Sequence, residues 1–379
     1  MPLYEVCLAG NLDATKVAEV RKAIEEGLAP QGKTLGVDVG WQVTPSIYSP
    51  PERVAAVVLF FGGADKSVLS FKDALKRGIP CLPIVSDLKN VSAETPTELT
   101  ALNCIGYADS GPTRIASAAM EAIGLLPKQR RVFVSYRRTE SREAAVQLFD
   151  GLSGKLFDVF LDTHGVAPGD DFQSILWHRL CDCDVLVMLD TATYFESRWT
   201  AAEFGRALAK GISVLRVAWP GVTASKRTTT AHSIDLAASN FAATGLLTQA
   251  AIDQIQQKVE ELRSLSHAVR WLNMYSNIEQ SVKKISGSIK GMGLYNSVHV
   301  ILPSGKDVLL VPALGVPTAN TLQAAESVGG GGTVAVVYDH VGLLPAWQAH
   351  LAWLGDRIDT VHWMKASDIA WQLAELEAI

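Results

Sequence analysis

The feature that most constrains the fold is a series of three short apolar segments between Arg131 and Ile212. The segments are RVFVS, FDVFLD and DVLVMLD, and the third is followed by SRWTAAEFGRALAKGI, whose apolar residues recur at helical spacing. Apolar runs that alternate with helices are typical of a parallel sheet covered on both faces. We therefore predict a doubly wound α/β domain in this part of the chain.

Polar residues stand where the predicted strands end, and ligands of doubly wound sheets bind beyond the carboxyl ends of the strands. The residues at these ends are Ser135, Arg137, Asp162 and Asp190. On the helix that follows, Trp199 and Glu203 are four residues apart, which predicts that both side chains share one face, one turn from each other. These positions make the carboxyl edge the candidate site.

The stretch from about residue 129 to 245 resembles a TIR domain, the Toll/interleukin-1 receptor fold, and in particular the bacterial TIR domains that cleave NAD+. The matching residues are FVSYRR at 133–138, VFLD at 159–162, Pro-Gly at 168–169 and WTAAE at 199–203. The order of these motifs is more specific than the Trp-x-x-x-Glu spacing alone. The segments on either side have no comparable resemblance.

The resemblance implies that Glu203 is the catalytic carboxylate of an NAD+ glycohydrolase. It would hydrogen-bond the ribose hydroxyls and stabilise the positive charge that develops on the ribose when nicotinamide leaves. The products would be nicotinamide and ADP-ribose or a cyclic isomer, with NAD+ as substrate and with no cofactor or metal. The structural alternative is a solvated helix charge paired with Arg206 or Lys210. We expect Glu203→Ala to leave the fold intact, since a surface substitution costs less than about 0.5 kcal/mol.

Seven further residues are candidates for substrate binding, namely Trp199, Tyr136, Arg137, Arg138, Phe172, Ser197 and Asp162. Trp199 would supply an aromatic floor, although helical aromatic residues are usually packed in a core. Tyr136 and Phe172 are candidates for stacking on a ring of the substrate. The two arginines suit a phosphate, with surface ion pairs as the alternative. Ser197 is a candidate helix cap, and Asp162 is expected to order the following loop.

The loop THGVAPGDD follows the second predicted strand and carries Gly165, Pro168 and Gly169. The glycines give the loop the freedom to change shape. By resemblance, this loop helps to complete the site when neighbouring TIR domains associate. We therefore expect self-association to activate the protein.

The length of 379 residues predicts two or three domains. We expect three flavodoxin-like or TIR-like units with doubly wound parallel sheets: a TIR-like or flavodoxin-like domain without a catalytic motif at 1–126, the TIR domain at 129–245, and a C-terminal α/β unit at 294–379 that senses a ligand or drives oligomerisation. A helical connector is expected at 248–290. In the last unit, SVHVIL, DVLLVPAL, TVAVVYD and DTVHWM are the strand candidates.

A faint internal repeat links the first two units, because SFKDALKRGIP at 70–80 aligns without a gap on EFGRALAKGIS at 203–213. In this register Ser70 takes the place of Glu203, and Lys66 takes the place of Trp199. The first unit is therefore expected to be inert. The alternative is that any helix-to-strand junction in an α/β protein produces such a pattern.

Composition excludes several other classes of protein. The net charge of −5 and the pI near 5.9 argue against a basic nucleic-acid-binding face, and no apolar run is long enough to span a membrane. The five cysteines are scattered, which suits a reducing, cytoplasmic environment. The spacing in Cys181-Asp182-Cys183 matches no common zinc site.

The resemblance implies an enzyme of antiphage or stress defence that depletes NAD+ or makes a nucleotide signal. Two alternatives stay open. One is a TIR scaffold that assembles without catalysis. The other is a nucleotide-binding sensor whose C-terminal unit holds a small ligand, with PALGVPTANT at 312–321 as a weak phosphate candidate because it follows a strand and opens a helix. The trigger would be a nucleotide ligand or a protein partner.

Overall fold

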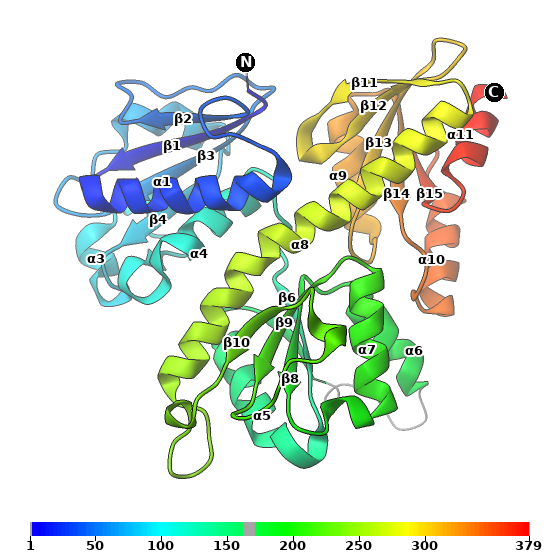
Figure 1. The fold of residues 1–379 in the computed structure, drawn as a ribbon. Helices are drawn as coiled ribbons and strands as arrows, with labels where there is room; N and C mark the ends of the chain where they lie inside the picture. Colours follow the sequence, from blue (N-terminus) through cyan, green and yellow to red (C-terminus); the bar gives the residue numbers. More distant parts are fainter. Residues whose placement is uncertain (1, 162–170, 379) are drawn as a thin grey trace. The chain divides into compact units, whose positions relative to one another are not determined.

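The computed structural model describes residues 2–161 and 171–378 and divides the chain into two compact units, Met1–Lys128 and Gln129–Ile379. The expected α/β architecture is confirmed, because three sheets flanked by helices follow one another along the chain (Figure 1). The first unit contains one sheet and the second unit contains two. Among the described helices, none combines the length and the hydropathy that crossing a membrane requires.

The first unit is a parallel sheet with strand order β2-β1-β3-β4-β5. Its strands are β1 (Tyr4–Gly10), β2 (Val39–Val43), β3 (Ala55–Phe61), β4 (Cys81–Val85) and β5 (Ile105–Gly106). Its helices are α1 (Ala14–Leu28), α2 (Lys72–Lys76), α3 (Val91–Glu94) and α4 (Tyr107–Ala122). The central strand β3 is almost wholly buried, as expected for the apolar run AAVVLFF with both faces covered.

The central sheet, at the start of the second unit, is also parallel, with order β10-β9-β8-β6-β7. Its strands are β6 (Arg131–Ser135), β7 (Asp158–Leu161), β8 (Val185–Asp190), β9 (Ser213–Ala218) and β10 (His232–Asp235). Its helices are α5 (Arg138–Gly154), α6 (Phe172–Cys181) and α7 (Arg198–Ala209). Numbered within each unit, both sheets have the order 2-1-3-4-5, which is the flavodoxin-like arrangement.

The third sheet is mixed, with order β11-β12-β13-β14-β15. Its strands are β11 (Ser288–Met292), β12 (Val298–Ile301), β13 (Asp307–Ala313), β14 (Thr333–Tyr338) and β15 (Val361–Lys365). Its helices are α9 (Ala319–Gly329), α10 (Pro345–Gly355) and α11 (Ile369–Ala378). The first three strands pair antiparallel and the last three pair parallel, so only the β13–β15 part is wound as we expected for a parallel unit.

Helix α8 (Gln249–Lys284) is one continuous helix that belongs to two hydrophobic cores. Ile255 and Val259, in its first half, pack into the core of the central sheet, whereas Ile278 and Val282 pack into the core of the third sheet. At 1.5 Å per residue its 36 residues extend about 54 Å. The helix therefore joins the two sheets of the second unit (Figure 1).

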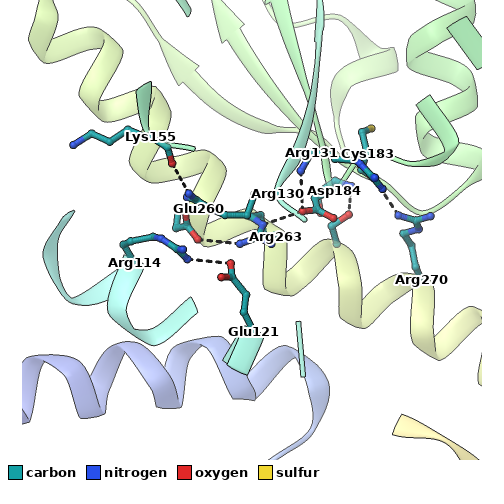
Figure 2. Close-up of polar contacts among 12 residues, drawn as sticks. Arg114, Glu121, Arg130, Arg131, Lys155, Cys183, Asp184, Glu260, Arg263 and Arg270 are labelled. Atoms are coloured by element: carbon teal, nitrogen blue, oxygen red, sulfur yellow. Dashed lines mark hydrogen bonds and ion pairs between the residues drawn. The ribbon is translucent and has the colours of Figure 1, made fainter. Parts of the chain in front are cut away.

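A buried ionic network fixes α8 at the amino ends of β6 and β8 (Figure 2). Glu260 accepts hydrogen bonds from Arg130 and, at 3.2 Å, from Arg263, and Arg263 also donates to Asp184 at 2.9 Å. Burial raises the pKa of Asp184, while the charge of Arg263 opposes that rise. Removing one partner of such a network leaves a buried charge uncompensated, so the network fixes the position of the helix.

Candidate active site

The candidate site lies at the carboxyl ends of β6 and β8, which pair in parallel so that Ser135 stands opposite Met188. The chain then passes from β8 through a short 3-10 helix, Tyr194–Glu196, into α7. This path brings residues from three segments to one edge of the sheet. The edge is the position at which doubly wound folds bind ligands.

Glu203 is buried at this edge, with 4% of its surface exposed. Its Oε2 accepts a hydrogen bond of 2.5 Å from the Ser135 hydroxyl, which is in turn hydrogen-bonded to the Tyr194 hydroxyl at 2.7 Å. Glu203 is therefore not a solvated helix charge. The expectation that Glu203→Ala would behave as a surface substitution is wrong, because the change would remove the acceptor of a buried donor.

The residues that would have neutralised a solvated Glu203 have other contacts. The Arg206 guanidinium lies 3.6 Å from the centre of the Trp177 ring. The Lys210 ammonium pairs with the carboxylate of Asp339, in the segment after β14. Both side chains therefore have charged or aromatic partners of their own.

Tyr194 is fixed by burial and by a hydrogen bond to its backbone, and its hydroxyl is hydrogen-bonded to Ser135. Its side chain is completely buried, and the Thr200 hydroxyl donates to its backbone carbonyl. Burial raises the pKa of the Tyr194 phenol well above its ordinary value, and the nearby charge of Glu203 adds to the rise. The phenol is thus a neutral hydrogen-bonding group beside the carboxylate.

Trp199 lies one turn before Glu203 but is 45% exposed, so the two side chains meet different surroundings. The Arg198 guanidinium lies 4.4 Å from the centre of its ring. Ser197 occupies the N-cap position of α7, a helix that lies wholly within the described residues. Its side chain makes no capping hydrogen bond to the amides of this helix. Of the pair that we predicted to share a face, one is an open aromatic surface and the other is a buried acid.

The remaining predicted residues are not all brought together. Tyr136 is buried in the core of the central sheet, which does not favour stacking on a ligand, and Phe172 starts α6 against the opposite core. Arg138 is exposed at the start of α5. Arg137 donates to the Glu196 carboxylate at 3.1 Å and to the carbonyl of Thr193. The surface ion pair that we gave as the alternative for Arg137 therefore forms with Glu196, on the segment that leads to α7.

The predictions for Asp162 and for the loop residues Gly165, Pro168 and Gly169 concern positions that lie outside the described residues.

Two acidic residues near the edge have structural partners. Asp190 is buried and accepts a 2.5 Å hydrogen bond from the buried Arg216. Burial raises the pKa of Asp190, and the Arg216 guanidinium opposes that rise. Glu140 accepts from the Thr193 hydroxyl, and hydrogen bonds from the Thr191 and Thr193 side chains hold its pKa below its usual range. Asp190 therefore links β8 to β9, whereas Glu140 orders the segment after β8.

Sequence reasoning placed Ser135 at a strand end but missed Tyr194 and the hydrogen-bonded chain that links it to Glu203. Nothing in the YFES segment marks Tyr194, because a tyrosine between a strand and a helix is most often a packing residue. Among the described residues, no three His, Cys, Asp or Glu side chains form a group that could hold a metal ion.

Residues 132–248 match a family model described as TIR domain. No curated protein matches the chain. The solved structure of tagatose-6-phosphate ketose/aldose isomerase from Escherichia coli is similar to the chain at 12% sequence identity. The match covers 72% of this chain and 82% of that chain, with a TM-score of 0.20. A likeness at this score carries no argument about fold or activity.

Proposed function

From the presence of a TIR domain at residues 132–248, we propose that this chain cleaves NAD+ at the bond between nicotinamide and ribose, with Glu203 as the catalytic carboxylate. The single observation that carries the proposal is the placement of Glu203. A buried acid stands at the carboxyl edge of a doubly wound sheet, held by a hydroxyl from the end of a neighbouring strand. Acidic residues on helices are more often exposed to solvent.

The reaction breaks the bond between nicotinamide and ribose and joins the same ribose carbon to a new nucleophile. Nicotinamide leaves as a neutral base with the electrons of the broken C–N bond, and positive charge develops on the ribose. A carboxylate beside the ribose stabilises that charge. Water then adds to the same ribose carbon and releases a proton, which gives ADP-ribose; attack by a group of the bound nucleotide gives a cyclic isomer instead.

Substrate binding has to change the surroundings of Glu203. With its Oε2 bonded to Ser135, the carboxylate is closed to solvent, so a ribose hydroxyl takes over an interaction that Ser135 supplies in the free protein. Trp199, which is exposed one turn earlier on α7, offers the aromatic surface on which a planar ring of NAD+ rests. Arg137, which pairs with Glu196, is the candidate for a phosphate contact.

The proposal includes assembly through the TIR domains, activation by that assembly, and a role in antiphage or stress defence, all of which follow from the resemblance alone. A site that is closed in the single chain is compatible with activation by a neighbour, because contact between copies supplies energy to rearrange it. A ligand or a protein partner would act as the trigger.

The proposal is tested by incubating the purified full-length protein with NAD+ over two decades of protein concentration and identifying the products by mass. We expect nicotinamide together with ADP-ribose or a cyclic isomer, and a rate that rises more steeply than the protein concentration. Unchanged NAD+ at the highest concentration, from protein shown by sedimentation to be assembled, would refute the enzyme and favour a TIR scaffold.

A further inference from the structure

A cavity of about 310 Å³ lies at the carboxyl ends of the parallel strands β13, β14 and β15, away from the edge that holds Glu203. Leu314, Asp339 and Ala366, each of which follows one of these strands, line it. Asn273 on α8 and Lys210 at the end of α7 line it as well. The position is that of ligands in α/β folds, and the volume lies in the range of small-molecule sites.

The charged groups of the cavity favour an anion. Lys210 and Arg270 bring two positive charges, and Asp339 brings one negative charge. The Lys210 ammonium donates to the Asp339 carboxylate and to the carbonyl of Val341. Two nitrogens of the Arg270 guanidinium donate to backbone carbonyls of the α6–β8 connection, out of the five N–H donors that such a group carries.

A further polar group of the lining lacks a contact. The Nδ1 atom of His340 is buried and has no hydrogen-bond partner within the described part of the chain. A buried polar atom without a partner is unfavourable, and a bound water or ion is one of its ordinary explanations. In the turn after β13, our weak phosphate candidate, the Val316 amide donates to Asp182 at 2.8 Å, so this amide is already occupied.

We propose that this cavity binds a small phosphorylated molecule, with its phosphate between Lys210 and Arg270. Such a ligand must compete with the Asp339 carboxylate for Lys210. A phosphate monoester does so better than a carboxylate, because it carries nearly two negative charges and three acceptor oxygens at neutral pH. Both cations line the same cavity.

The site has a direct connection to the candidate active site. Lys210 is the C-cap of α7, seven residues and about 10 Å along the helix from Glu203. A phosphate that replaces Asp339 as the partner of Lys210 changes the contact that fixes the end of this helix. That the change alters catalysis rests on the proposed function, whereas ligand binding does not.

Calorimetric titration of the full-length protein with AMP, ribose 5-phosphate, inorganic phosphate and adenosine tests the proposal. We expect the phosphorylated probes to bind and adenosine to bind at least tenfold more weakly. Asn273→Trp, which places an indole in the cavity, should abolish binding, and Lys210→Met should weaken it at least tenfold. Leu272→Trp is the matched control, since Leu272 is the exposed neighbour on α8 and does not line the cavity.

Equal affinities for inorganic phosphate and AMP would support the phosphate contact and make free phosphate the ligand. Equal affinities for adenosine and AMP, binding that survives both Asn273→Trp and Lys210→Met, or no binding of any phosphorylated probe at millimolar concentration would overturn the site. Amide hydrogen exchange in α7, measured with and without AMP, tests whether ligand binding affects this helix independently of NAD+ cleavage. A change of at least twofold is expected, and unchanged exchange would contradict the connection.

Discussion

The first unit and the central domain share one strand order, 2-1-3-4-5, and differ at the edge where a site would form. In both, a glycine with positive φ follows the helix that precedes the fourth strand. These glycines are Gly78, with φ of 74°, and Gly211, with φ of 67°. The alignment of 70–80 with 203–213 therefore joins positions that are equivalent in the fold. The two sheets therefore share a topology, and the comparison rests on which residues each of them carries at this edge.

The difference lies in what the strand ends and the following helix carry. At the end of β1, Asn11 exchanges hydrogen bonds with the backbone of Asp65, so its side chain closes a loop. At the end of β6, Ser135 instead reaches the carboxylate of Glu203. Ser70 lies in a 3-10 turn before the five-residue α2, whereas Glu203 lies within the 12-residue α7. A longer helix gives the central domain room for an acid directed at the sheet.

The largest expected effect comes from a substitution in β9, the fourth strand of the central sheet, whose counterpart in the first unit is β4. β9 contains the buried Arg216, paired with Asp190, while β4 has the apolar sequence CLPIV. Arg216→Met should lower the free energy of unfolding by about 3–5 kcal/mol, because it leaves Asp190 buried without its cation. Urea denaturation of the full-length protein measures the change. Asp235→Asn is the control, since this second partner is 76% exposed and should cost less than about 1 kcal/mol; equal losses for both variants would contradict the role of burial.

A second comparison substitutes the two strand-end residues. Ser135→Ala removes a hydrogen bond to a buried carboxylate and should cost about 1.5–3 kcal/mol, whereas Asn11→Ala loses bonds to exposed backbone and should cost about 1 kcal/mol. NAD+ turnover should fall in the first variant and stay unchanged in the second. Denaturation and turnover are measured on both proteins. A fall in turnover with Asn11→Ala would mean that the first unit takes part in the reaction.

A third difference concerns pH, because every histidine lies in the second unit. Burial lowers the pKa of His267 on α8 to about 3. As the pH falls through about 6.5, the unfolded chain binds a proton at His267 that the folded chain does not bind. The stability contributed by neutral His267 is therefore fully present above that pH and is lost as the pH falls toward 3. Between pH 7 and 5 this costs about 2 kcal/mol.

The measurement is urea unfolding of the second unit, followed by tryptophan fluorescence, at pH 7 and pH 5. His267→Leu should reduce the pH dependence, while His350→Gln, at an exposed position, should leave it in place. An unchanged pH dependence in His267→Leu would show that another group is responsible.

How far the sequence predicts the structure depends on the range of the interactions involved. The strands β3 and β8 were predictable, because a continuous apolar run is buried on both faces whatever its neighbours are. The edge strand β11 was not among the predicted strands, because SIKGM is never fully buried and pairs antiparallel with β12. That pairing also makes the third sheet mixed.

For the site, motif order located Glu203 but not its surroundings. The Ser135 hydroxyl that holds it lies 68 residues earlier, and Tyr194 lies 59 residues from Ser135. Helical spacing places Trp199 and Glu203 one turn apart, yet it does not say which of them faces the sheet. Long-range packing decides that one is buried and the other is exposed.

The most direct measurement of the central claim compares NAD+ turnover in wild-type protein, Glu203→Gln and Ser70→Ala. The amide preserves the size of the side chain and can still accept from Ser135, so the fold should be retained. Loss of the carboxylate should reduce turnover about 100-fold or more, in line with the loss of one group that stabilises charge in a transition state. Ser70→Ala, at the equivalent position of the first unit, should match wild type. Wild-type turnover by folded Glu203→Gln would contradict the assignment of Glu203 as the catalytic residue.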